Sequence, residues 1–109
     1  MMTEQADEWY AVRCVFRWTE AAGQPYEERI TVWRAAGFDA VLARAEAEAR
    51  EYAANTGTTY LGLAQSYATG EEQLSPGSEV FSLLRGSDLP PDEYLDRHFS
   101  TGAEHEHTI

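Results

Sequence analysis

The sequence predicts an α+β fold in which two β-hairpins form a mostly antiparallel four-stranded sheet. One long helix packs on one face, in the order ββαββ, and a short helix follows at the C-terminal end. The length of 109 residues fits one domain, and a hydrophobic content of 43% suffices for one core. Apolar and polar residues alternate, as in strands, toward both ends of the predicted domain, and apolar residues recur with a helical period in its middle. We expect residues 1–8 to be a disordered N-terminus, residues 9–99 to form the single domain, and residues 100–109 to form a flexible tail.

The first hairpin is predicted from residues 9–18 and 26–35, which are rich in β-branched and aromatic side chains. A segment with glycine and proline separates them, as expected for a turn. Alternation places Tyr10, Val12, Cys14, Phe16 and Trp18 on one face of the first run, the predicted core face. We predict a register in which Cys14 lies opposite Ile30, which satisfies both faces of the hairpin.

This register has consequences for the two faces. It places Arg34 on the core-facing side and leaves the second face richer in apolar side chains than a solvated face needs. Tryptophan and arginine are enriched at protein interfaces. The candidate interface residues are Trp9, Arg13, Val15 and Trp33.

Residues 40–54 predict the long amphipathic helix, because apolar side chains recur there at spacings of three and four. Residues 58–67 alternate as a third strand. After a polar connection, residues 79–85 predict a fourth strand that is apolar on both faces, and the pattern leaves its facing open. Residues 91–99, with prolines and acids at their start, predict the short helix.

The formal net charge of −11 is unevenly distributed. Residues 70–109 hold nine acids against Arg85 and Arg97, a net charge of −7, whereas residues 9–69 have a net charge of −1. Such acidity disfavours binding to nucleic acids or anionic membranes and leaves a basic protein partner open. No apolar stretch approaches the roughly 20 residues of a membrane span, and the single cysteine is typical of a reducing compartment. We therefore expect a cytoplasmic protein.

Catalytic chemistry is not indicated by the sequence. The candidates for a nucleophile and a base are Cys14, in a strand, and His98, in the short helix, and each is more simply explained by packing. His105 and His107 alternate with glutamates, but no third and fourth ligand follow at a familiar spacing. No common nucleotide-binding or zinc motif is present. We expect no enzyme activity, no cofactor and no metal site.

Several short strings, WYAVR at residues 9–13, YEERI at 26–30 and RAAGF at 34–38, together resemble an uncharacterised actinobacterial family of small α+β domains of unknown function. YLGLA at 60–64 and SDLPPDEYL at 87–95 extend the resemblance over roughly residues 9–99. The resemblance implies a small standalone cytoplasmic protein and carries over no functional residue.

Three hypotheses for the function follow. The first is a non-enzymatic interaction or accessory protein that forms a homodimer through its sheet. The second is an immunity or inhibitor protein whose acidic C-terminal half binds a basic partner. The third is a binder of small anionic ligands that uses Arg29 or Arg34, although an ion pair with a nearby acid at the sheet edge is the favoured explanation of Arg34.

Overall fold

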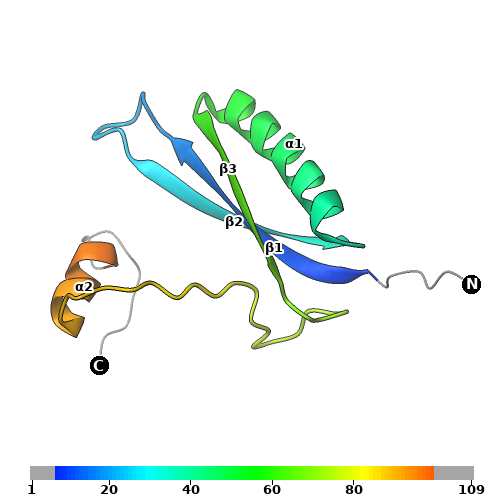
Figure 1. Cartoon of the computed structure of the whole chain (residues 1–109). Coiled ribbons are helices and arrows are strands. Elements are labelled where there is room, and N and C mark those ends of the chain that lie inside the picture. The colour runs from blue at the N-terminus through cyan, green and yellow to red at the C-terminus, as the bar shows by residue number, and fades with distance from the viewer. Residues whose placement is uncertain (1–6, 100–109) are drawn as a thin grey trace, which may run out of the picture.

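The computed structural model describes residues 7–99 and contains three strands and two helices (Figure 1). The predicted tail and residues 1–6 of the predicted disordered N-terminus lie outside the described residues, whereas Glu8 already belongs to the first strand. In chain order the elements are β1 (Glu8–Arg17), β2 (Tyr26–Ala35), α1 (Phe38–Thr56), β3 (Thr59–Ala68) and α2 (Pro91–His98).

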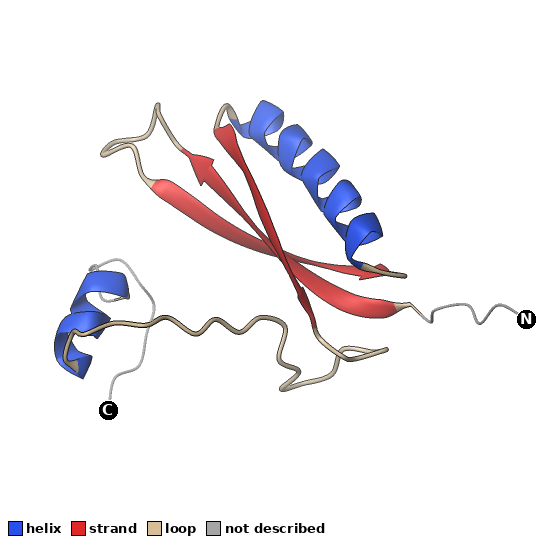
Figure 2. Ribbon diagram, in the orientation of Figure 1, coloured by secondary structure: helices blue, strands red, loops and turns tan. Residues whose placement is uncertain are grey.

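The sheet has three strands, not four. β1 pairs antiparallel with β2 on one side and with β3 on the other, so the order is β2-β1-β3. The prediction of a four-stranded sheet in the order ββαββ is therefore wrong. Residues 79–85 have the composition of a strand but lie in the irregular stretch that leads from β3 to α2 (Figure 2), because none of their backbone groups is hydrogen-bonded to the backbone of a strand.

The predicted register of the first hairpin is wrong by one residue. Cys14 lies opposite Arg29, and Ile30 lies opposite Arg13. Since side chains alternate along a strand, this shift moves every β2 side chain to the other face. Trp33 therefore lies opposite Tyr10 and faces α1, whereas Arg34 faces away from α1. Apolar alternation could not fix this register, because α1 supplies polar partners for the charged side chains of β2.

α1 confirms the predicted long helix and covers one side of the sheet. Four of its residues, all small or β-branched, are buried against the strands: Val41, Ala45, Ala49 and Ala53. Alternate residues of β1 complete this core: Tyr10, Val12, Cys14 and Phe16. The prediction that these β1 residues face the core is confirmed.

A bulge interrupts β3. Cys14 pairs with Ala64, but Phe16, two residues further along β1, pairs with Tyr60, four residues further back along β3. Gly62 lies in this irregularity with a φ of 81°, a left-handed conformation that favours glycine. The bulge leaves β3 a less regular edge than β2, whose ten pairs with β1 run without interruption.

We call the side of the sheet that packs on α1 the helix face and the opposite side the open face. After β3 the chain continues as an arm, residues 69–90, which passes on the open side of the sheet and leads to α2 (Figure 1). Among the described residues, no Cα atom of α2 lies within 8 Å of a Cα atom of β1, β2, β3 or α1. α2 therefore contributes little to the core around α1.

Candidate functional site

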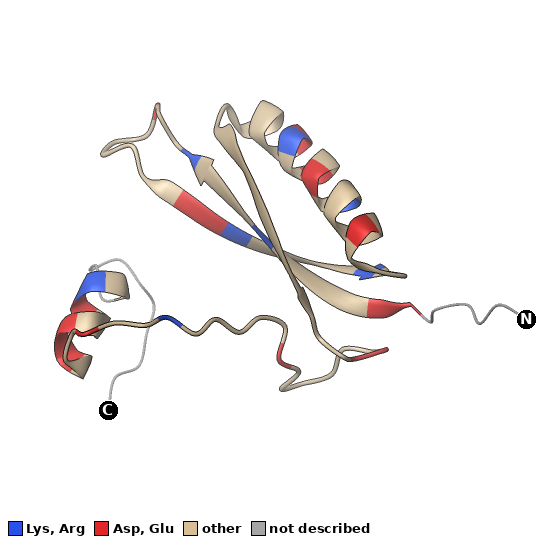
Figure 3. Ribbon diagram, viewed as in Figure 1, with Lys and Arg blue, Asp and Glu red and all other residues tan. Residues whose placement is uncertain are grey.

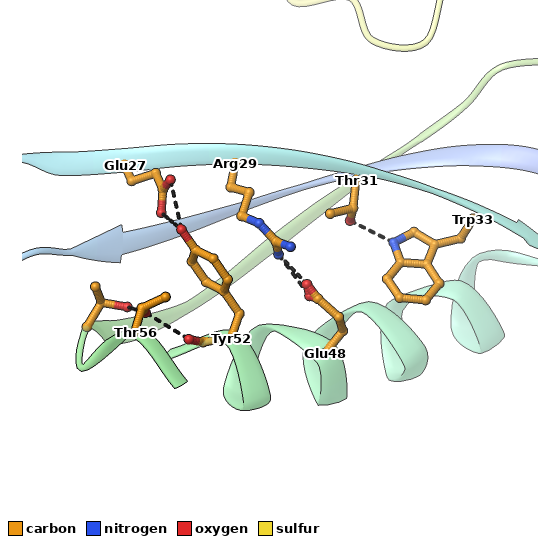
Figure 4. A network of polar contacts seen from close by, with 8 residues as sticks. Glu27, Arg29, Thr31, Trp33, Glu48, Tyr52 and Thr56 are labelled. Carbon is orange, nitrogen blue, oxygen red and sulfur yellow. Dashed lines mark hydrogen bonds and ion pairs between the residues drawn. The ribbon is translucent and has the colours of Figure 1, made fainter. Parts of the chain in front are cut away.

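Polar side chains join β2 to α1 on the helix face (Figure 4). Arg29 forms an ion pair with Glu48, and its guanidinium lies 4.0 Å from the ring centroid of Tyr52. The Tyr52 hydroxyl donates to both carboxylate oxygens of Glu27, at 2.8 and 3.0 Å. Trp18 also donates to Glu27, over 3.2 Å. This network explains why charged β2 side chains face a helix.

Arg29 and Arg34, the predicted anion-binding residues, are not brought together. Their odd and even positions place Arg29 on the helix face and Arg34 on the open face. A cavity of about 270 Å³ lies beside Arg29, but it is lined by two acids, Glu48 and Glu51, in addition to Tyr52 and Asn55. Arg29 is already paired with Glu48 and lies beside a second carboxylate, so this cavity does not attract an anion.

Cys14 and His98, the nucleophile and base candidates, also lie apart. Cys14 is buried on the helix face, and burial raises the pKa of its thiol, which disfavours the reactive thiolate. His98 belongs to α2, where its ring lies 4.5 Å from that of Tyr94. Burial also raises the pKa of Tyr60, whose hydroxyl donates to Glu46. The buried Cys14 and the half-buried Tyr60 fit a structural role.

The open face carries an apolar strip. Its large side chains keep between 41% and 47% of their surface exposed: Ile30, Val32, Leu61 and Leu63. Ile30 and Val32 come from β2 and lie opposite Arg13 and Ala11 of β1, whereas Leu61 and Leu63 come from β3, so both edge strands contribute to the strip. The predicted register placed Ile30 and Val32 against the core, so neither was among the predicted interface residues.

Three arginines and one glutamate accompany the apolar strip. Arg13 lies 3.2 Å from Glu28 and donates two hydrogen bonds to the side-chain oxygen of Gln65, at 2.6 and 3.2 Å. The Arg17 guanidinium lies 4.1 Å from the ring centroid of Tyr26. With Arg34, the open face has an excess of positive charge on a chain that is strongly acidic elsewhere.

Three of the four predicted interface residues lie on the open face: Trp9, Arg13 and Val15. Trp33 does not, because the true register turns it toward α1. There its ring nitrogen donates to Thr31, and Arg44 of α1 lies 5.3 Å from its ring.

The arm covers part of the open face. The Tyr67 hydroxyl donates to Glu79 over 2.9 Å. The ring centroid of Phe81 lies 5.8 Å from that of Tyr67 on one side and 5.0 Å from the Arg13 guanidinium on the other. Further along the arm, Leu83 and Arg85 line a cavity of about 280 Å³. Arg13 and Glu28 of the sheet and Tyr94, His98 and Phe99 at the C-terminal end complete its wall.

Within residues 7–99, no three acidic, histidine or cysteine side chains converge as a metal site would require. His105 and His107 lie outside the described residues. Neither described helix has both the length and the apolar character needed to cross a bilayer.

Comparison with known proteins gave no relative. No protein-family model matches this chain, and no curated protein or solved structure is significantly similar to it. The resemblance to an actinobacterial family therefore stays a prediction, and the open face with its arm is the site that the geometry itself singles out.

Proposed function

We propose that this chain is a non-enzymatic interaction protein that self-associates through the open face of its sheet. The observation that carries the proposal is the apolar strip of Ile30, Val32, Leu61 and Leu63, which the arm leaves about half exposed. Large apolar side chains that gather on one exposed face of a small protein mark an interaction site. Full burial of such a side chain is worth roughly 1.5 to 3 kcal/mol, so a second surface over the strip would recover a large part of this free energy.

The composition around the strip supports the same proposal. Arg13, Arg17 and Arg34 lie among apolar side chains, a combination that protein interfaces prefer. A two-fold dimer would use the same face of both copies. We further propose a cytoplasmic location, because the one cysteine, Cys14, is buried and unpaired as is usual in a reducing compartment.

Light scattering coupled to size exclusion tests the proposal. We expect the full chain to elute as a dimer at micromolar concentration and Val32→Glu to weaken the dimer by about 100-fold or more, since an unpaired buried charge costs several kcal/mol. Ala47→Glu, on the exposed side of α1, adds the same charge away from the open face and should leave the dimer intact. A wild-type chain that stays monomeric up to high micromolar concentration contradicts the proposal.

A basic protein partner is the alternative that the charge distribution favours. Acidic residues gather on α2, where Asp92, Glu93 and Asp96 face solvent with Arg97 as a neighbouring base (Figure 3). Charge complementarity would speed association with a basic protein. Titration with a basic model protein at low and high salt tests this alternative, and binding that does not weaken with salt argues against it.

A further inference from the structure

Residues 79–85 of the arm have strand character but no backbone partner. The sequence EVFSLLR is rich in apolar side chains and includes one β-branched residue, Val80, and its backbone lies outside every described helix and strand. Among the described residues, none of residues 79–89 takes part in a hydrogen bond between backbone groups. Extended backbone with unpaired N–H and C=O groups is a template for pairing with another strand.

The odd-numbered side chains of this segment lie toward the chain's own sheet, whereas the even-numbered ones are mixed, since Val80 is half-buried. Glu79 and Phe81 contact the chain's own open face, and Leu83 and Arg85 line the cavity above it. Leu84 points the other way and is 98% exposed. Because the segment lies on top of the sheet, its backbone groups are one layer above the chain's own strands. Among the described residues, no strand is hydrogen-bonded to them.

The outer edge of β2 is the regular edge available for such pairing. β2 pairs with β1 on one side only, over ten uninterrupted positions, whereas the bulge at Gly62 disrupts the other edge strand. A bulge discourages the addition of another strand at an edge, whereas an edge of ten residues without a bulge permits it.

One antiparallel alignment matches the segment to β2 in both charge and apolar character. Glu79 opposite Arg34 places Arg85 opposite Glu28, so both ends of the segment form pairs of opposite charge. Between these ends Phe81 meets Val32 and Leu83 meets Ile30. All four β2 residues belong to the open face.

Other alignments lose this match. A parallel alignment over the same residues of β2, 28–34, sets Glu79 against Glu28, and an antiparallel alignment shifted by two residues sets Glu79 against Val32. Like charges opposite each other destabilise a strand pair, and a charge opposite an apolar side chain gains nothing.

We propose that residues 79–85 pair with the β2 edge of a second copy of this chain, reciprocally in a two-fold dimer. The proposal deepens the self-association proposed above and rests on it. Each arm keeps Phe81 and Glu79 on its own open face while its backbone joins the other copy's sheet, so the two open faces lie against each other. The chain's own sheet remains three-stranded, and Leu84 packs on the side where Arg29 of the second copy lies.

Disulfide trapping tests the pairing directly. Directly opposite residues of antiparallel strands have Cα atoms about 4.5 to 5.5 Å apart, within disulfide range. In a Cys14→Ala background, Phe81→Cys combined with Val32→Cys should give a covalent dimer on a non-reducing gel. Phe81→Cys combined with Thr31→Cys is the matched control, because Thr31 faces the opposite side of β2, and it should stay monomeric. A disulfide within one chain, or equal cross-linking of both pairs, overturns the proposal.

Charge reversal provides a second test that does not depend on cysteine chemistry. Arg34→Glu should raise the dimer dissociation constant about tenfold, because a two-fold dimer contains the contact twice. Adding Glu79→Arg to the same chain should restore the constant to within about threefold. Arg17→Glu, on the same face but outside the alignment, should not be rescued by Glu79→Arg. If Glu79→Arg worsens the Arg34→Glu variant, the alignment is wrong.

The two proposals fail in different ways. A wild-type chain that is monomeric at every concentration removes both of them. The second outcome is a wild-type dimer that Val32→Glu disrupts, with neither the disulfide nor the charge rescue found. This outcome supports the open face as the interface and contradicts only the pairing of the arm.

Discussion

Arg29 is held from two directions on the helix face. Glu48 of α1 neutralises its charge, and the ring of Tyr52 lies against its guanidinium. The side chains of Arg29 and Glu48 are 29% and 27% exposed, so neither is fully solvated. A pair at this depth is less screened than a surface pair and costs more when one partner is removed.

We expect Arg29→Met and Glu48→Gln each to lower the free energy of unfolding by about 1 kcal/mol. The double variant should lose less than the sum of the two, with a coupling of about 0.5 to 1 kcal/mol, because the second substitution removes a charge that no longer has a partner. Urea denaturation followed by circular dichroism measures the free energy of unfolding of the wild type, the two single variants and the double variant. Additive losses would show that the ion pair contributes nothing and that packing on Tyr52 explains both variants.

At the scale of elements, β3 combines strand pairing with a local irregularity. Gly62 has a left-handed backbone conformation, and a Cβ atom added there would meet no atom within 4 Å. Any cost of a side chain at this position is therefore a backbone cost and not a steric clash with neighbours.

Gly62→Ala should destabilise the protein by about 1 to 2 kcal/mol, the cost of a left-handed conformation for a residue with a Cβ atom. Gly86→Ala is the matched control, because the added Cβ also meets open space and the glycine does not have a left-handed φ. That control should change stability by less than about 0.5 kcal/mol. Equal effects of both substitutions in thermal or urea unfolding would mean that the bulge does not depend on glycine.

At the scale of the whole molecule, the core holds several groups that ionise in alkali. Burial raises the pKa of Tyr10, Cys14, Tyr52 and Tyr60 above their ordinary values of 10.0 for tyrosine and 9.0 for cysteine. Neighbouring carboxylates add to the effect, with Glu8 beside Tyr10, Glu27 beside Tyr52 and Glu46 beside Tyr60. The folded state therefore holds these protons more tightly than the unfolded chain does.

The contribution of these four groups to stability should be constant below about pH 9 and should fall as the pH rises further. In the unfolded chain these groups lose their protons near the ordinary values, whereas in the folded chain they do so only at higher pH, so alkali favours unfolding. Each group contributes at most about 1.4 kcal/mol per pH unit. Urea midpoints by circular dichroism between about pH 7 and 11 measure the decline, and Tyr60→Phe should make it shallower. A flat profile up to pH 11 would contradict the role of buried hydroxyls and thiol.

The sequence by itself determined the elements whose signal is local. The limits of β2 and the presence of β1, α1, β3 and α2 follow from alternation, helical spacing and turn residues, and the structure agrees with them to within two residues at each end of the predicted runs. The burial of Tyr10, Val12, Cys14 and Phe16 follows from the same alternation. These features depend on neighbours in the chain, which the sequence contains.

Only the tertiary structure decided which residues meet across the sheet. The register could not be predicted because Arg29 and Glu27 find polar partners on α1, at Glu48 and Tyr52, and this reversed the facing that apolar content alone suggests. For the same reason Trp33 moved to the helix face. Residues 79–85 were wrongly predicted for a different reason. Their composition is that of a strand, but a strand also needs a neighbouring strand to pair with its backbone. Whether such a neighbour lies beside the segment depends on the tertiary structure, and here no backbone partner is present among the described residues.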